Sequence, residues 1–175
     1  MVEKLGTLEI RSGKVIASDP CYNSGIWCAS EITDVLNGKY IAQMNIIDCN
    51  RWGDRVGVLE IIHEDYKDKL DECDMEYDST CGVDSGTFSL SDKIYYNLFH
   101  EKELDEEWYD VYVCGMEGRG HIVGDAMAMS YSGYGDGGYP VYARREPKNG
   151  YVVSIFVDFL GIYDDEEEEQ DFHNE

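Results

Sequence analysis

Basic residues are scarce in this sequence: 14 Lys and Arg stand against 37 Asp and Glu, which gives a formal net charge of −23 over 175 residues. A molecule of this charge repels phosphate backbones and anionic lipid headgroups, and it attracts cations and basic protein surfaces. Solubility alone asks for a net charge of about 2 to 8 in magnitude on a small domain. The charge therefore argues against direct binding to nucleic acid or to a membrane, and it favours a basic protein as the partner.

Long apolar runs are also missing. No stretch approaches the ~18 apolar residues that a membrane span requires, and residues 1–13 contain no apolar leader segment. Six cysteines are present without a C-x-x-C pair, so the usual spacing of a structural zinc site is lacking. We expect a cytoplasmic protein in which all six thiols are reduced.

Proline is rare, with three residues, while 18 glycines and 14 tyrosines are spread along the chain. This composition favours many short strands joined by glycine turns over a helical bundle. We predict a mainly β (α+β) fold, an antiparallel sandwich or partly open barrel of about 8–10 short strands with one or two short helices. No internal repeat period is visible, which argues against a solenoid or a propeller.

Strands are expected where β-rich runs are bounded by turn residues. Three pairs of runs are predicted to form hairpins: residues 7–11 with 14–18 through Ser12-Gly13, residues 39–48 with 55–63, and residues 139–145 with 151–160 through Asn149-Gly150. Residues 108–115 and 121–131 are each predicted as one further strand. Residues 30–38 are predicted as one or two helical turns, and Ser91-Asp92 is predicted to cap a short helix that runs to Phe99.

The acidic residues fall into a tail and a body. Residues 164–175, DDEEEEQDFHNE, hold eight carboxylates and no Lys or Arg, a composition that repels itself and has little to bury. We expect a single β-rich domain over residues 1–163 and a disordered acidic C-terminal tail over residues 164–175. Without the tail, 29 acids still stand against 14 bases, so the body itself is strongly acidic.

Within the body, two stretches concentrate the acids. Residues 60–78 carry nine carboxylates and only Lys67 and Lys69, and we predict a solvated loop followed by a strand there. Residues 101–110 form the second stretch. The carboxylates predicted to make an acidic binding face are Glu64, Asp65, Asp68, Asp71, Glu72, Asp74, Glu76, Glu103, Asp105, Glu106 and Glu107.

Four segments suggest a family. They are SDPCY at residues 18–22, GVDSG at 82–86, SGYGDGGYPVY at 132–142 and VVSIFVDF at 152–159. In this order, over about residues 7–160, they resemble the bacterial domain of unknown function 4241 family. The resemblance implies a compact β-rich domain and assigns no activity or catalytic residue. The acidic tail and the acidic middle stretch look like additions to the family pattern.

A metal or catalytic site is the alternative use of the shared segments. Asp19, Asp84 and Asp136 each lie beside Gly or Pro in a predicted turn, and oxygen ligands from separate loops commonly hold a divalent cation such as Ca²⁺. Aspartates in turns more often accept hydrogen bonds from their own backbone, which requires no metal. No calcium-loop, H-E-x-x-H, Walker, dinucleotide-binding or G-x-S-x-G pattern occurs. We therefore expect no cofactor and name no catalytic residue, with a cation as the alternative.

Two functions from different classes remain. The first is a non-enzymatic acidic binding protein that inhibits a basic, nucleic-acid-binding effector by imitating nucleic acid, as phage or plasmid anti-defence proteins of anti-CRISPR or anti-restriction type do. An immunity protein against a basic toxin is a variant of it. The second is a metal-dependent enzyme or metal-binding module that uses Asp19, Asp84 and Asp136. The sequence does not indicate an oligomeric state.

Overall fold

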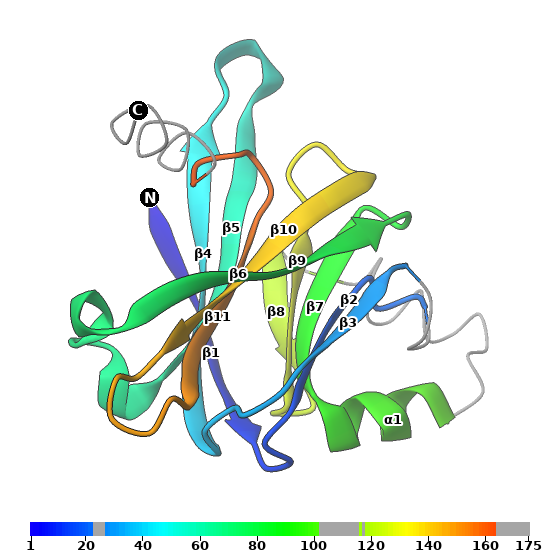
Figure 1. Ribbon diagram of the computed structural model, residues 1–175. Helices are drawn as coiled ribbons and strands as arrows, with labels where there is room; N and C mark the ends of the chain where they lie inside the picture. The colour runs from blue at the N-terminus through cyan, green and yellow to red at the C-terminus, as the bar shows by residue number, and fades with distance from the viewer. Residues whose placement is uncertain (23–26, 102–115, 117, 164–175) are drawn as a thin grey trace, which may run out of the picture.

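The computed structural model describes residues 1–22, 27–101, 116 and 118–163 (Figure 1). Within them the chain is mainly β, and its strands form two antiparallel sheets with no closed barrel, as a β sandwich does. The predicted fold class is therefore confirmed. The predicted strand at residues 108–115 and the tail at 164–175 lie outside the described residues.

The first sheet has six strands. In spatial order they are β1 (Val2–Ile10), β4 (Gly38–Asp48), β5 (Asp54–His63), β11 (Val152–Asp158), β10 (Gly137–Arg145) and β6 (Asp74–Val83). Strand β6 therefore lies at one edge of this sheet, and Figure 1 shows it crossing in front of β10 and β11.

The second sheet has five strands and carries the helix. Its spatial order is β3 (Ala29–Ile32), β2 (Val15–Ser18), β7 (Thr87–Asp92), β9 (Met127–Tyr131) and β8 (Gly120–Val123). The α1 helix (Lys93–Glu101) follows β7 directly and lies beside this sheet at the lower right of Figure 1.

The core lies between the sheets. Along β4 the residues Tyr40, Ala42, Met44 and Ile46 are buried while the residues between them are partly exposed, the alternation of a strand with one face inward. Strands β7 and β11 are instead buried at every position, as expected of central strands covered on both faces. The alternation along β4 therefore shows which face of its sheet is turned to the core, and the continuous burial of β7 and β11 marks the centre of each sheet.

Two predicted hairpins and the second helix are confirmed. Strands β4 and β5 pair through the short η1 turn (Asn50–Trp52), and β10 pairs with β11. The turn between β10 and β11 is closed by the buried Glu146, which accepts hydrogen bonds from the N–H groups of Lys148 and Asn149. Burial alone would raise the pKa of Glu146, and these backbone bonds lower it overall.

The first predicted hairpin is wrong. Strand β1 pairs with β4 and β2 pairs with β3 and β7, so residues 11–14 cross from one sheet to the other. The crossing is held by Asp92, whose Oδ2 accepts hydrogen bonds from the N–H groups of Arg11 (2.7 Å) and Ser12 (2.9 Å). A local turn signal cannot reveal such a partner 80 residues away.

Residues 30–38 do not form the predicted helix. Their first part is strand β3, Asp34 has a positive φ of 57°, and Val35 makes an isolated parallel bridge to Val152. Tertiary pairing of two apolar residues, Ile32 and Val35, with the sheets overrides the weak helical pattern. The predicted single strand at residues 121–131 is also wrong, because a turn with Gly124 and Asp125 at positive φ divides it into β8 and β9.

Asp92 joins the crossing segment to the helix. Its Oδ1 accepts from the N–H groups of Ile94 (2.9 Å) and Tyr95 (3.4 Å), which caps α1 as predicted, while Oδ2 holds residues 11 and 12. The side chain is buried, so both oxygens depend on these donors.

We predict that Asp92→Asn lowers the free energy of unfolding by about 2–3 kcal/mol, because an amide provides one acceptor where the carboxylate provides two. Urea unfolding followed by circular dichroism measures the loss. Asp125→Asn, at an exposed position with positive φ that Asn tolerates, is the control and should change stability by less than about 0.5 kcal/mol. Equal stabilities of the two variants would contradict the role of Asp92.

Candidate acidic interaction surface

The acids of the β5–β6 connection form one exposed surface. The connection contains the short η2 (Glu64–Tyr66) and η3 (Leu70–Glu72) helices and leads into the first half of β6, which lies at the edge of its sheet (Figure 1). All seven described candidate carboxylates are exposed there: Glu64, Asp65, Asp68, Asp71, Glu72, Asp74 and Glu76. We call these seven residues the acidic ridge.

His63 fixes the start of the ridge. Its Nδ1 accepts a hydrogen bond from the N–H of Asp65 (3.2 Å), and its Nε2 lies 3.1 Å from the carbonyl oxygen of Asn37. The ring is buried edge-on against Tyr40 and Tyr66. Gly38 makes room for it, because a Cβ at that position would lie 2.6 Å from Nε2. The ridge therefore leaves the sheet from a rigid point.

Little positive charge neutralises the ridge. Among the residues that the structure describes, Glu76 pairs with the guanidinium of Arg145, and Asp65 lies 3.9 Å from Nδ1 of His63. Lys69 lies over the ring of Tyr66, with its Nζ 5.8 Å from the ring centre. The other five ridge carboxylates have no ion pair within the described part of the chain, so the surface keeps a concentrated negative charge.

Strand β6 separates the acids from apolar side chains. Tyr77 lies opposite Tyr142 of β10, and their rings meet edge to face at 6.0 Å, while Asp74 and Glu76 point to the opposite side of the strand. Met75 and Tyr77 are 41% and 54% exposed. The edge thus offers carboxylates on one side and apolar contact area on the other, a combination that protein interfaces use.

Glu60 does not belong to the ridge, although the sequence placed it in the same acidic stretch. It lies inside β5 and is paired with Arg144, and Ser154 and Gln43 donate further hydrogen bonds to its carboxylate (2.9 and 3.3 Å). The guanidinium of Arg144 also lies 4.5 Å from the ring centre of Phe156. Residues 60–63 belong to the predicted strand at 55–63, which is β5, and the strand predicted after the loop is β6, which begins at Asp74.

Asp19 is a structural residue in this arrangement. It is fully buried, and its two oxygens accept four hydrogen bonds, from the N–H groups of Cys21, Asp84 and Ser85 and from the Ser85 hydroxyl, at 2.7–3.0 Å. These bonds tie the end of β2 to the turn after β6. Both oxygens are therefore already used by donors of the protein.

Asp84 and Asp136 lie at neighbouring turns. The side chain of Asp84 accepts a hydrogen bond from the Tyr22 hydroxyl, which together with burial raises the pKa of Tyr22 to about 12. Asp136 is exposed and precedes Gly137, the partner of Val83 in the sheet. The fold thus brings the three segments to one edge, but no group of three or more His, Cys, Asp or Glu side chains suited to a metal occurs in the described residues.

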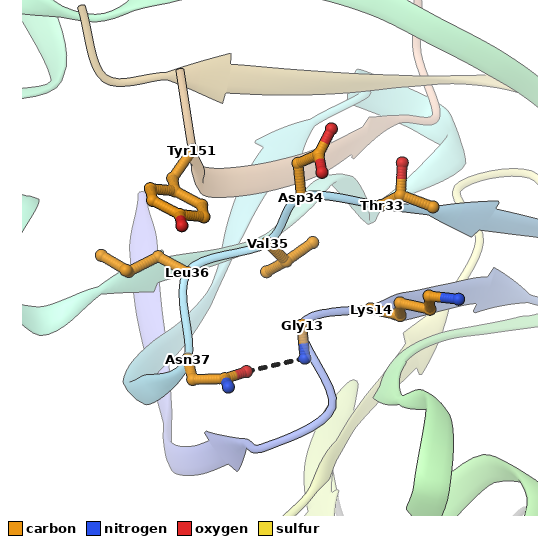
Figure 2. A pocket seen from close by; sticks show the side chains of 8 residues that line it. All are labelled: Gly13, Lys14, Thr33, Asp34, Val35, Leu36, Asn37 and Tyr151. Carbon is orange, nitrogen blue, oxygen red and sulfur yellow. Dashed lines mark hydrogen bonds between the residues drawn. The ribbon is translucent and has the colours of Figure 1, made fainter. Parts of the chain in front are cut away.

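A pocket is lined by residues 33–37, by Gly13 and Lys14, and by Tyr151. It has a volume of about 390 Å³, and Figure 2 shows Gly13 and Lys14 on one side and Tyr151 on the other. Asn37 accepts a hydrogen bond from the N–H of Gly13 (2.7 Å), and the Lys14 and Asp34 side chains point in different directions. The polar groups do not converge on one point, so this pocket lacks the geometry of a catalytic site.

The remaining predicted carboxylates, Glu103, Asp105, Glu106 and Glu107, lie outside the described residues. Within the part of the chain that is described, no helix is long and apolar enough to cross a membrane.

Comparison with known proteins gives no match: no protein-family model matches the chain, and no curated protein or solved structure does. The resemblance to the domain of unknown function 4241 family therefore stays a prediction.

The buried thiols yield a chemical prediction. Burial, followed by the charge of Asp19, raises the pKa of Cys28 to about 11, and burial raises that of Cys81 to about 12. Both thiols are protonated at pH 8 and should not react with a thiol reagent in the folded protein. Thiol counting should give six after unfolding. A count of four or fewer after unfolding would contradict the reduced state. Labelling of two more thiols in the folded original protein than in folded Cys28→Ser/Cys81→Ser would contradict the burial of these two thiols.

Proposed function

We propose that this is a non-enzymatic acidic binding protein whose acidic ridge occupies the basic, nucleic-acid-binding site of a partner protein. Inhibitors of the phage or plasmid anti-defence type, including anti-CRISPR and anti-restriction proteins, act in this way. The observation that carries the proposal is the exposure of all seven ridge carboxylates, along the β5–β6 connection and the start of the edge strand β6, with only Asp65 and Glu76 near a basic side chain in an ion pair among the described residues.

Strand geometry supports the imitation of a phosphate backbone. Residues two apart on an extended strand lie about 6.6 Å apart, which is the relation of Asp74 to Glu76 in β6. This spacing is about twice the ~3.4 Å of helix axis per phosphate of one strand, so it corresponds to every second phosphate. The connection that contains η2 and η3 carries the other five exposed carboxylates just before the strand.

Electrostatic complementarity supports fast and selective association. A negative surface on a molecule of net charge −23 raises the rate of encounter with a basic cleft and repels nucleic acid itself. Met75 and Tyr77 add exposed apolar area on the opposite side of the same strand. The partner we propose is therefore a protein with a positively charged groove.

The test compares two charge-reversal variants of the full chain. In the ridge variant Asp68, Asp71, Glu72 and Asp74 become Lys, while Asp65 and Glu76 are kept because they contact His63 and Arg145. In the control, Glu3, Glu9, Asp54 and Asp136 become Lys, which changes the net charge equally. Proteins captured from a cell lysate on the original chain should be enriched in nucleic-acid binders, and added nucleic acid should compete for them.

The ridge variant should associate with the captured protein at least about tenfold more slowly at low salt than the control does, because the local field steers the encounter. The difference between the two rates should shrink at high salt, because the Debye length falls from about 8 Å at physiological ionic strength to about 3 Å at 1 M and exposed charges no longer attract each other over a distance. Equal association rates of the two variants, or a captured set without nucleic-acid binders, would refute the proposal.

A further inference from the structure

The tip of the β4–β5 hairpin has the opposite character to the acidic ridge. Arg51 and Arg55 lie over the rings of Trp52 and Tyr134, with 5.5 and 5.3 Å between each guanidinium carbon and the ring centre. The Nε of Arg55 also donates a hydrogen bond to the carbonyl oxygen of Trp52 (3.1 Å). We call Arg51, Trp52, Arg55 and Tyr134 the arginine–aromatic tip.

The tip is exposed and adjoins an apolar pocket. Trp52 and Tyr134 are 59% and 57% exposed. Tyr134 also lines a pocket of about 420 Å³, together with Ile47, Cys49, Phe159, Leu160 and Ile162. Large aromatic side chains beside an open apolar pocket are typical of a binding surface rather than of a surface in contact with water alone.

Both arginines are available for an acidic ligand. Neither is within 4 Å of a carboxylate oxygen of any residue that the structure describes. The carboxylate of the nearby Asp48 instead accepts a hydrogen bond from the N–H of Asn50 (2.8 Å). A guanidinium already held over an aromatic ring can form bidentate bonds to a carboxylate at small entropic cost.

We propose that the arginine–aromatic tip and its pocket bind the acidic C-terminal residues 164–175 of this chain. These residues carry eight carboxylates and one aromatic residue, Phe172. They begin directly after Tyr163, and Ile162 already lines the pocket. Twelve residues in extended form span up to about 40 Å, so both the arginines and the pocket are within their reach.

Tethering is the reason to choose this occupant over a separate acidic protein. A net charge of −23 repels any free acidic ligand before it arrives at the tip. A segment joined to the domain is present at an effective concentration in the millimolar range, which offsets that repulsion without further contacts. This proposal is independent of the function of the acidic ridge.

The indole N–H signal of Trp52 in the NMR spectrum of the full chain reports on the tip, and Trp52→Phe assigns it. Replacing Glu166, Glu167, Glu168 and Glu169 by Gln should shift this signal by more than its linewidth. The signal of Trp27 should stay in place. The same shift should follow from raising the salt concentration to about 1 M, which screens exposed ion pairs.

Two variants of equal charge complete the test. In the Arg51→Glu/Arg55→Glu variant, which keeps Trp52, the Trp52 signal should no longer respond to the glutamine substitutions in the tail. Lys4→Glu/Lys39→Glu, at exposed positions on β1 and β4, should preserve the response. A Trp52 signal that ignores the tail substitutions in the full chain would overturn the proposal. So would a response that grows with protein concentration, since the tail of another molecule would then be the ligand.

Discussion

The structure depends on buried carboxylates that are satisfied by backbone N–H groups. Asp19, Asp92, Glu146 and Asp158 are almost fully buried, and each accepts hydrogen bonds from the backbone of a turn or a crossing segment. A chain with only 14 Lys and Arg cannot pair many of its acids with bases. Backbone donors replace them, and each buried carboxylate fixes the path of the chain where one element ends and the next begins.

The acidic residues therefore have two roles: the buried ones hold the backbone in place, and the exposed ones give the surface its negative charge. The buried acids bind backbone N–H groups: Asp19 binds the turn after β6, Asp92 binds the start of α1, and Asp158 binds residues 160–163. Two arginines are committed to particular carboxylates, Arg144 to Glu60 and Arg145 to Glu76. Within the described residues the acidic ridge is consequently left with concentrated negative charge, and the arginine–aromatic tip is a local exception.

Sequence patterns predicted the parts of the fold that depend on neighbours along the chain. The β4–β5 and β10–β11 hairpins have strong strand runs on both sides of a short turn, and Asp92 is an N-cap residue followed by apolar residues at helical spacing. One failure was local, because the Gly124-Asp125 turn that divides residues 121–131 was missed. The failed first hairpin and the failed helix involve distant partners: Asp92 holding Ser12, and Val35 bridging to Val152. No local signal encodes such contacts.

The sequence likewise predicted only the part of the candidate surface that is continuous along the chain. Clustering of acids along the sequence identified the ridge, because carboxylates without apolar neighbours remain exposed. It could not separate Glu60, which lies next to Arg144 only through the pairing of β5, β11 and β10. The arginine–aromatic tip was missed because Tyr134 joins it from a different part of the chain; the R-W-G-D-R pattern of residues 51–55 was the available signal.

Displacement of a basic protein from nucleic acid tests the central claim most directly. Lysate proteins held on immobilised double-stranded DNA are eluted with the full chain, with the ridge variant, or with its charge-matched control. If the ridge occupies a nucleic-acid site, the original chain and the control release the same basic protein and the ridge variant does not. Release by all three to the same extent, or by none of them, would contradict the proposed role of the acidic ridge.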